Sequence, residues 1–105
     1  MTEPGTLSHG AGGALRIAVD AERYRIEAED ARSLLSSGRV VPVYEDRSQS
    51  GIAIEGHAAM NPSGRAVVLH TRVGSCIIPL VSFRRVARGE AASAPLFPLV
   101  PGVTG

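Results

Sequence analysis

The sequence predicts a mostly β fold of the α+β class, built as a small antiparallel barrel that is partly open or as a curled sheet. The expected order is β-β-α-β-β-β-β, with one or two short helices. Three observations predict it: apolar and polar residues alternate over most of residues 14–89, helical spacing replaces this alternation only in short stretches, and Gly, Pro and Asn mark turns between the segments. The chain of 105 residues has the length of one domain.

The first half of the predicted core holds two strands and a helix. Residues 29–35 are good helix formers with acidic residues first, which favours one short helix, and Gly38 is suited to end it. Before them, apolar residues at every second position indicate two half-buried strands joined by a turn at residues 20–22. These apolar residues are Leu15, Ile17 and Val19, followed by Tyr24, Ile26 and Ala28.

Four more strands are predicted in the second half of the core. Residues 39–45 form the first of them, and Pro42 within it has no backbone N–H, which predicts that this strand lies at an edge or a bulge. A meander of three strands follows, with turn signals in the sequences Asn-Pro-Ser-Gly and Val-Gly. The meander strands are residues 52–60, 65–73 and 75–81.

The lengths of these two turns predict the register of the meander. They pair Met60 with Arg65 and Thr71 with Cys76, which separates the side chains between two faces. Cys76 is then expected to be a buried structural residue and not a nucleophile. The core face holds Ile52, Ile54, Ala58, Met60, Val67, Leu69, Val73, Cys76, Ile78 and Leu80. The outer face holds Glu55, His57, His70 and Arg72, together with Val68 and Ile77.

The two ends of the chain differ in composition. Residues 1–13 contain four glycines and a single large apolar residue, Leu7, which predicts a flexible N-terminal arm before a single β-rich domain at 14–89. Packing on its own domain, docking on a partner and disorder are equal alternatives for the tail that follows. This proline-rich tail, residues 90–105, carries Leu96, Phe97, Leu99 and Val100.

Composition excludes several classes of protein. The formal net charge of +1 disfavours a histone-like or polybasic membrane-surface protein, although all 11 Lys and Arg positions are Arg. This arginine content either serves bidentate binding of phosphate and carboxylate or reflects the base composition of the gene. One Cys excludes an intrachain disulfide and a zinc site of several cysteines. No segment resembles a membrane span or a signal peptide, so the sequence favours a cytoplasmic protein without membrane contact.

His57 and His70 are weak candidates for metal ligands. The predicted register makes them diagonal neighbours on the outer face, with Glu55 opposite His70. Two imidazoles and a carboxylate match zinc or non-haem iron in ligand type. Their spacing matches no compact metal motif, and such side chains also occur on the solvated face of an ordinary sheet. We therefore expect no metal and no other cofactor.

One loop resembles part of a known signature. Asp46, Ser48 and Gly51 in the segment DRSQSG resemble the D-x-S-x-x-G half of the signature of PilZ domains, small β-barrels that bind cyclic di-GMP. The other half of that signature is R-x-x-x-R, and the arginines upstream of residue 46 are never four residues apart. The resemblance covers six residues, and the sequence favours a polar hairpin loop here.

Residues 82–89 predict a second, short helix, capped by Ser82 and ended by Gly89. A cluster of arginines on this helix is suited to hold a phosphate, a nucleic-acid backbone or an acidic partner. Cations also favour the C-terminal turn of a helix in water, so a solvated face is the alternative. The clustered side chains are Arg84, Arg85 and Arg88.

The hypothesis that follows is a small non-catalytic interaction or assembly module, since no catalytic set is identified. It would bind a protein partner or a second copy of the chain. The alternative is a small barrel that binds a phosphate-bearing ligand or a nucleic acid with the same arginines. A metal-dependent enzyme using His57 and His70 is the remote alternative. The residues expected to bind the partner are Arg84, Arg85, Arg88, Leu96, Phe97 and Leu99.

Overall fold

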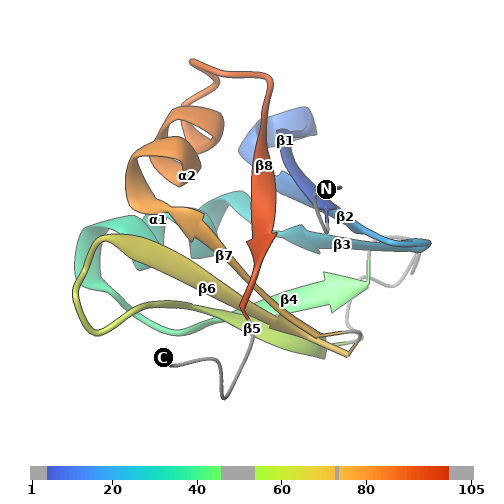
Figure 1. Cartoon of the computed structure of the whole chain (residues 1–105). Coiled ribbons are helices and arrows are strands. Elements are labelled where there is room, and N and C mark those ends of the chain that lie inside the picture. The colour runs from blue at the N-terminus through green and yellow to red at the C-terminus, as the bar shows by residue number, and fades with distance from the viewer. Residues whose placement is uncertain (1–4, 46–53, 73, 100–105) are drawn as a thin grey trace.

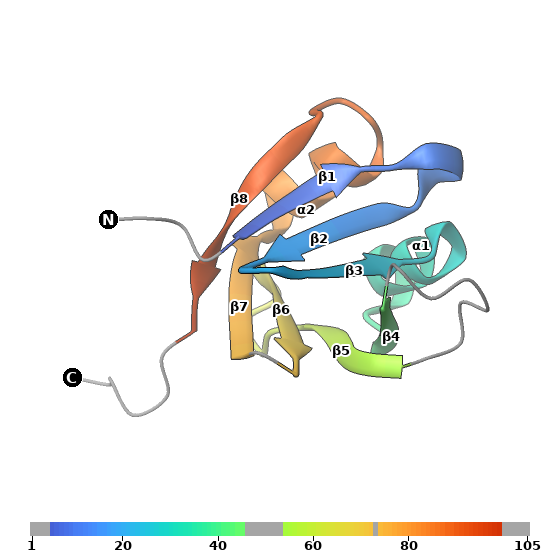
Figure 2. The ribbon, with the colours of Figure 1, turned by 90° about the vertical axis from the view of Figure 1, so that its right-hand side faces the viewer.

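Residues 5–45, 54–72 and 74–99, which the computed structural model describes, form an antiparallel β-barrel with two α-helices (Figure 1). Each strand pairs with its neighbours in the sequence, and β8 pairs with β1 to close the barrel (Figure 2). The helices are α1 (Ala28–Ser37) and α2 (Leu80–Ala87), and a 3-10 turn spans Ala11–Gly13. The strands are β1 (Gly5–His9), β2 (Leu15–Val19), β3 (Glu22–Ile26), β4 (Val41–Glu45), β5 (Ile54–Met60), β6 (Ala66–Thr71), β7 (Gly74–Pro79) and β8 (Ser93–Pro98).

The predicted fold class is confirmed, and the structure adds one strand at each end of the predicted order. The expectation of a flexible arm is wrong for residues 5–9, because they form β1. Leu7 is fully buried and lies opposite Ile17 of β2 and Ala94 of β8. A strand pairs through its backbone N–H and C=O groups, which requires few apolar side chains. The glycine-rich composition of residues 1–13 was therefore misleading. The described barrel therefore extends beyond residues 14–89.

The tail packs on its own barrel over residues 93–98. β8 lies between β1 and β7, and Leu96 is fully buried in the core. Its neighbour Phe97 lies opposite Ile77 and is 45% exposed, and Leu99 is 37% exposed. Of the three alternatives for the tail, packing on its own domain is the one that holds for residues 93–98. This segment closes the barrel.

Both helices lie close to their predicted positions. α1 ends at Gly38, whose left-handed conformation (φ +69°) lets its N–H donate to the carbonyl of Leu34 at 3.0 Å. α2 begins at Leu80, two residues before the predicted cap Ser82, and no side chain caps it. The Leu80 N–H donates instead to the carbonyl of Arg65 at 2.8 Å, which ties the start of the helix to the start of β6.

The register of the meander differs from the prediction by two residues in both hairpins. Met60 lies opposite Val67, and Leu69 lies opposite Cys76. A shift of two residues keeps every side chain on its predicted face, because side chains alternate with a period of two. The core face is accordingly confirmed for most of the described residues that were assigned to it: Ala58, Val67, Leu69, Cys76 and Ile78 are buried, and Met60 and Leu80 pack against the core from its edge.

Ile54 is an error in the predicted core, since it is 56% exposed. The β4–β5 register shifts between Val43 and Tyr44, so β5 carries an extra residue there and its alternation changes. Pro42 lies next to this irregularity, and β3 pairs only with Tyr44 and Glu45 of β4. The missing backbone N–H of Pro42 is therefore tolerated, as expected. Ile52, Val73 and the DRSQSG loop lie outside the described residues.

The two helices lie side by side against the barrel (Figure 1). Ala31 and Leu34 of α1 and Phe83 and Val86 of α2 belong to the same buried cluster as the inward side chains of the strands. Among the described residues, neither helix is long and apolar enough to cross a membrane. The sides of α1 and α2 that do not pack against the strands remain available to form a surface where the two helices lie next to each other.

Candidate anion-binding pocket between the two helices

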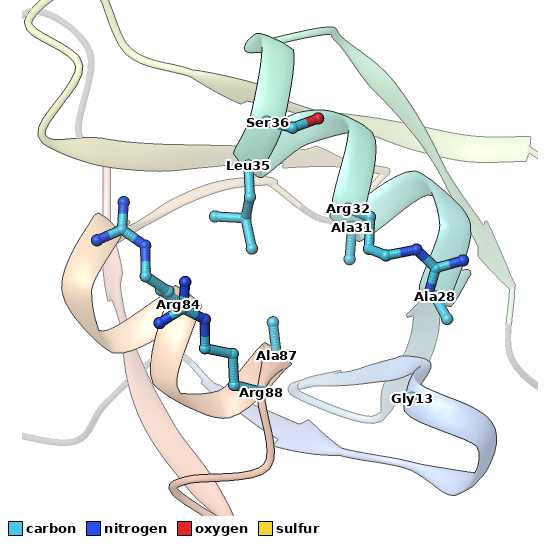
Figure 3. A pocket seen from close by; sticks show the side chains of 9 residues that line it. All are labelled: Gly13, Ala28, Ala31, Arg32, Leu35, Ser36, Arg84, Ala87 and Arg88. Carbon is cyan, nitrogen blue, oxygen red and sulfur yellow. The ribbon is translucent and has the colours of Figure 1, made fainter.

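A pocket of about 700 Å³ lies between α1 and α2 (Figure 3). Its base is made of aliphatic side chains: Ala31 and Leu35 of α1 point toward Ala87 of α2 across the opening (Figure 3). Three of the helix positions in the lining are alanine, whose short side chains leave this space between the helices unfilled. The lining consists of Gly13, Ala28, Ala31, Arg32, Leu35, Ser36, Arg84, Ala87 and Arg88.

Arginines supply all the charge in this lining. Arg84 lies on α2, and Arg88 directly follows the last residue of this helix. Because the two are four residues apart and Arg88 keeps a helical backbone conformation, they lie on one face of the end of the helix. Arg32 comes from α1, on the other side of the opening. None of the three forms a hydrogen bond or ion pair through its side chain with another described residue. The pocket therefore combines an aliphatic base with three guanidinium groups that have no carboxylate partner in this part of the chain.

The acidic residues nearest to Arg32 in the sequence lie outside this pocket. Glu27, Glu29 and Asp30 belong to the start of α1 and line a separate hollow, which Arg32 also borders. Burial, together with repulsion by Glu29 and Glu27, raises the pKa of Asp30 above its ordinary value. Negative charge is thus concentrated on one side of Arg32, and the lining between the helices is left cationic.

A histidine fixes the end of α2 that carries Arg88. The ring Nδ1 of His9, at the end of β1, is 2.9 Å from the carbonyl oxygen of Val86. Gly89, in the left-handed region at φ +75°, follows Arg88, and a Cβ atom at this position would lie 3.6 Å from the same imidazole ring. These contacts hold the last turn of α2 against the barrel, so the backbone that presents Arg84 and Arg88 is firmly placed.

The predicted arginine patch is therefore only partly assembled into one site. Arg84 and Arg88 line the pocket, whereas Arg85 is exposed and is absent from its lining. Sequence reasoning missed Arg32. Its helical spacing to Ala28 and Ser36 does place the three residues on one face of α1, but the spacing cannot show that this face lies against α2.

The tail residues that were expected to bind a partner fall into two groups. Leu96 is buried in the barrel and is not available, whereas Phe97 and Leu99 are exposed. Phe97 continues an apolar row on the outside of β5–β8, in which each residue lies directly opposite the next. The row consists of Ala59, Val68, Ile77 and Phe97.

His57 and His70 lie on the outer face, as predicted, but directly opposite one another instead of diagonally. Glu55 does not lie opposite His70; it forms an ion pair with Arg72. Within the described ranges, no group of three or more His, Cys, Asp and Glu side chains is placed to hold a metal ion. A three-ligand zinc or iron centre is therefore not assembled in this part of the chain.

Cys76 is expected to react slowly with a thiol reagent in the native protein and rapidly after denaturation. The residue is 3% exposed, and its burial, with a smaller effect of Asp20, raises the pKa of the thiol. Both effects reduce attack by the thiolate at neutral pH. Colorimetric thiol labelling with and without guanidinium chloride checks this. Equal rates in the two conditions would show that β7 does not turn Cys76 into the barrel.

Comparison of the chain with protein-family models, with curated proteins and with solved structures finds no significant match. The resemblance of the DRSQSG loop to half of the PilZ signature is therefore not extended by any family match.

Proposed function

We propose that this protein is a binding protein for a small amphipathic anion, which it holds in the pocket between α1 and α2. The observation that carries the proposal is the set of three arginines, Arg32, Arg84 and Arg88, around an aliphatic base, without a carboxylate in the lining. A guanidinium presents parallel N–H donors that match the oxygens of phosphate and carboxylate groups. An anionic head group would supply the partners that these arginines lack among the described residues.

The base of the pocket supports an aliphatic ligand body. Its apolar lining consists of alanine and leucine, and no aromatic side chain takes part. Bases of nucleotides usually bind by stacking on aromatic rings, so this lining is poorly suited to a nucleobase. A volume of about 700 Å³ lies within the usual range of small-molecule sites. A short alkyl chain with a phosphate or carboxylate head fits both the chemistry and the size.

The lining supports binding without turnover. It contains no His, Cys, Asp or Glu, and its one hydroxyl belongs to Ser36. General acid–base and nucleophilic catalysis both require a titratable group within hydrogen-bonding reach of the ligand. Arg84 and Arg88, two of the three arginines that were expected to bind a phosphate-bearing ligand, would therefore serve recognition alone, together with Arg32.

Titration with octyl phosphate in a calorimeter tests the proposal. We expect saturable binding of one octyl phosphate per chain. Inorganic phosphate should bind more weakly because it lacks the alkyl chain, and octanol should bind more weakly because it lacks the anionic group. Replacing Arg32, Arg84 and Arg88 together by Gln should lower the affinity at least about 100-fold, since a hydrogen bond to a charged group contributes roughly 1.5–3 kcal/mol. The melting temperature should change little, because these side chains make no ion pair with a described residue.

Arg85→Gln is the control for loss of a positive charge outside the pocket, because it removes one arginine from α2, whereas the triple variant removes three arginines from the lining. It should leave the affinity for octyl phosphate within about twofold, since an exposed charge that does not contact the ligand contributes little. Equal affinity of the wild type and the triple variant would contradict the proposal. Tight binding of an RNA or DNA oligonucleotide, with none of octyl phosphate, would favour the nucleic-acid alternative instead.

Self-association is a second candidate function, and the apolar row of Ala59, Val68, Ile77 and Phe97 favours it. The partner would be a second copy of the chain, whose identical row would cover the exposed ring of Phe97. Sedimentation velocity at increasing concentration should then show a dimer, and Phe97→Ser with Leu99→Ser should remain monomeric. A wild-type monomer at all concentrations would contradict this candidate.

A further inference from the structure

The outer face of β5, β6 and β7 carries a polar row that the proposed pocket does not use. His57 lies directly opposite His70, and His70 lies directly opposite Ser75. Both histidines are exposed, and both border a shallow hollow over β5 and β6. Directly opposed residues on neighbouring strands have Cβ atoms about 4.5–5.5 Å apart. Two imidazole rings at this separation can turn their nitrogens toward one ion.

A hydrogen bond orients one of these rings. Nδ1 of His70 is 2.8 Å from Oγ of Ser75. When Nδ1 donates this hydrogen bond, the other ring nitrogen, Nε2, carries a free lone pair. Histidines that bind metals nearly always donate their second ring N–H to an oxygen in this way. The contact with Ser75 therefore prepares His70 as a ligand.

Arg72 forms an ion pair with a carboxylate that borders the same hollow as the histidines. Its guanidinium lies 3.5 Å from Oε1 of Glu55 and 3.2 Å from Oε1 of Glu22. Glu55 is two residues before His57 on β5 and borders the same hollow. Arg72 thus withholds a potential third ligand and adds a positive charge beside the histidines. Both effects weaken, without preventing, the binding of a cation between the two imidazoles.

We propose that His57 and His70 together bind one divalent transition-metal ion, with water completing its coordination. Imidazole nitrogens suit Cu²⁺, Ni²⁺ and Zn²⁺, whereas Mg²⁺ and Ca²⁺ prefer oxygen ligands. For the same two nitrogens, Cu²⁺ binds more tightly than Ni²⁺ or Zn²⁺. The site is independent of the pocket between the helices, since no residue is shared by the two linings.

Calorimetric titration of the full chain with Ni²⁺ tests this site. We expect one Ni²⁺ per chain, and His57→Asn or His70→Asn should lower the affinity about 100-fold, the scale of the gain when two linked groups bind together. Ser75→Ala should lower it about tenfold through the lost orientation of His70. Arg72→Ser should raise it, because Glu55 becomes available. His9→Asn is the control for a histidine elsewhere and should leave Ni²⁺ binding unchanged.

Two readouts separate loss of the site from loss of the fold. Saturating Ni²⁺ should raise the melting temperature of the wild type and of Arg72→Ser, but not that of the variant lacking both His57 and His70, because only a ligand of the folded state stabilises it. Electron paramagnetic resonance of bound Cu²⁺ should show coupling to two imidazole nitrogens. Unchanged Ni²⁺ affinity in the folded double variant, or absence of binding in the wild type, would overturn the proposal.

Discussion

Replacement of Leu96 by Ala is expected to lower the free energy of unfolding by about 2–5 kcal/mol, the range for a large side chain removed from a core. Leu96 is fully buried, and it lies on the strand that joins β1 to β7. Loss of its packing weakens the closure of the barrel as well as leaving a cavity. Chemical denaturation of the two proteins, followed by circular dichroism, measures the difference.

The neighbouring residue supplies the control. Phe97→Ala removes a larger side chain from the same strand, but this side chain is 45% exposed and should cost clearly less than Leu96→Ala. Truncation after Gly89 removes the whole of β8 and should abolish cooperative unfolding, because β1 and β7 both lose a partner strand. An equal cost for Leu96→Ala and Phe97→Ala would contradict the inward orientation of Leu96.

Gly56→Ala is expected to be at least as damaging, at about 3 kcal/mol or more, which is the upper range for forced overpacking. A Cβ atom at this position would lie 1.9 Å from the carbonyl oxygen of His70 on β6. The obstacle is backbone, so relief requires the separation of β5 from β6 where they pair. The melting temperature and the denaturation midpoint should both fall steeply.

Gly64→Ala distinguishes this steric effect from backbone strain. Gly64 has φ +73°, and a Cβ atom there would meet no other atom within 4 Å. The substitution should therefore cost only the penalty of the left-handed conformation, about 1–2 kcal/mol. A Gly56→Ala protein as stable as Gly64→Ala would show that β5 and β6 are not as close at residue 56 as the structure places them.

Local patterns predicted most of the barrel between residues 15 and 79. Alternation identified β2 and β3, and the change to helical spacing with Gly38 identified α1. These features depend on near neighbours in the chain, which a sequence displays directly. Even the two-residue error in the meander left the faces correct, since the side-chain period is two.

The two terminal strands could not be predicted in the same way. β1 carries one large apolar side chain, Leu7, and β8 contains Pro95 and Pro98, so neither has the composition of a typical strand. Each is stabilised by pairing with the other across a long stretch of sequence: Gly5 lies opposite Leu96, 91 residues later, and Ser8 lies opposite Ser93, 85 residues later. Such long-range pairing is invisible to local patterns, and so the closure of the barrel was missed.

The sequence predicted only part of the candidate pocket. The arginines of α2 stood out as a dense cluster, and two of them, Arg84 and Arg88, do line the pocket. Arg32 and Leu35 could not be assigned to the same site, because the packing of α1 beside α2 is decided by the core positions of both helices, such as Leu34 and Phe83. For His57 and His70 the face was predicted correctly, and the two-residue shift made them direct partners.

The measurement that tests the central claim most directly is a ¹H–¹⁵N NMR titration of the full chain with octyl phosphate. We expect shifts that saturate together and are concentrated in α1, the last turn of α2 and the residue that follows it, with Arg32, Ser36, Ala87 and Arg88 among the residues most affected. Inorganic phosphate and octanol should reproduce parts of this pattern at higher concentration. Shifts concentrated on the outer strands, or no saturable shifts in the two helices, would contradict the assignment of this pocket as an anion-binding site.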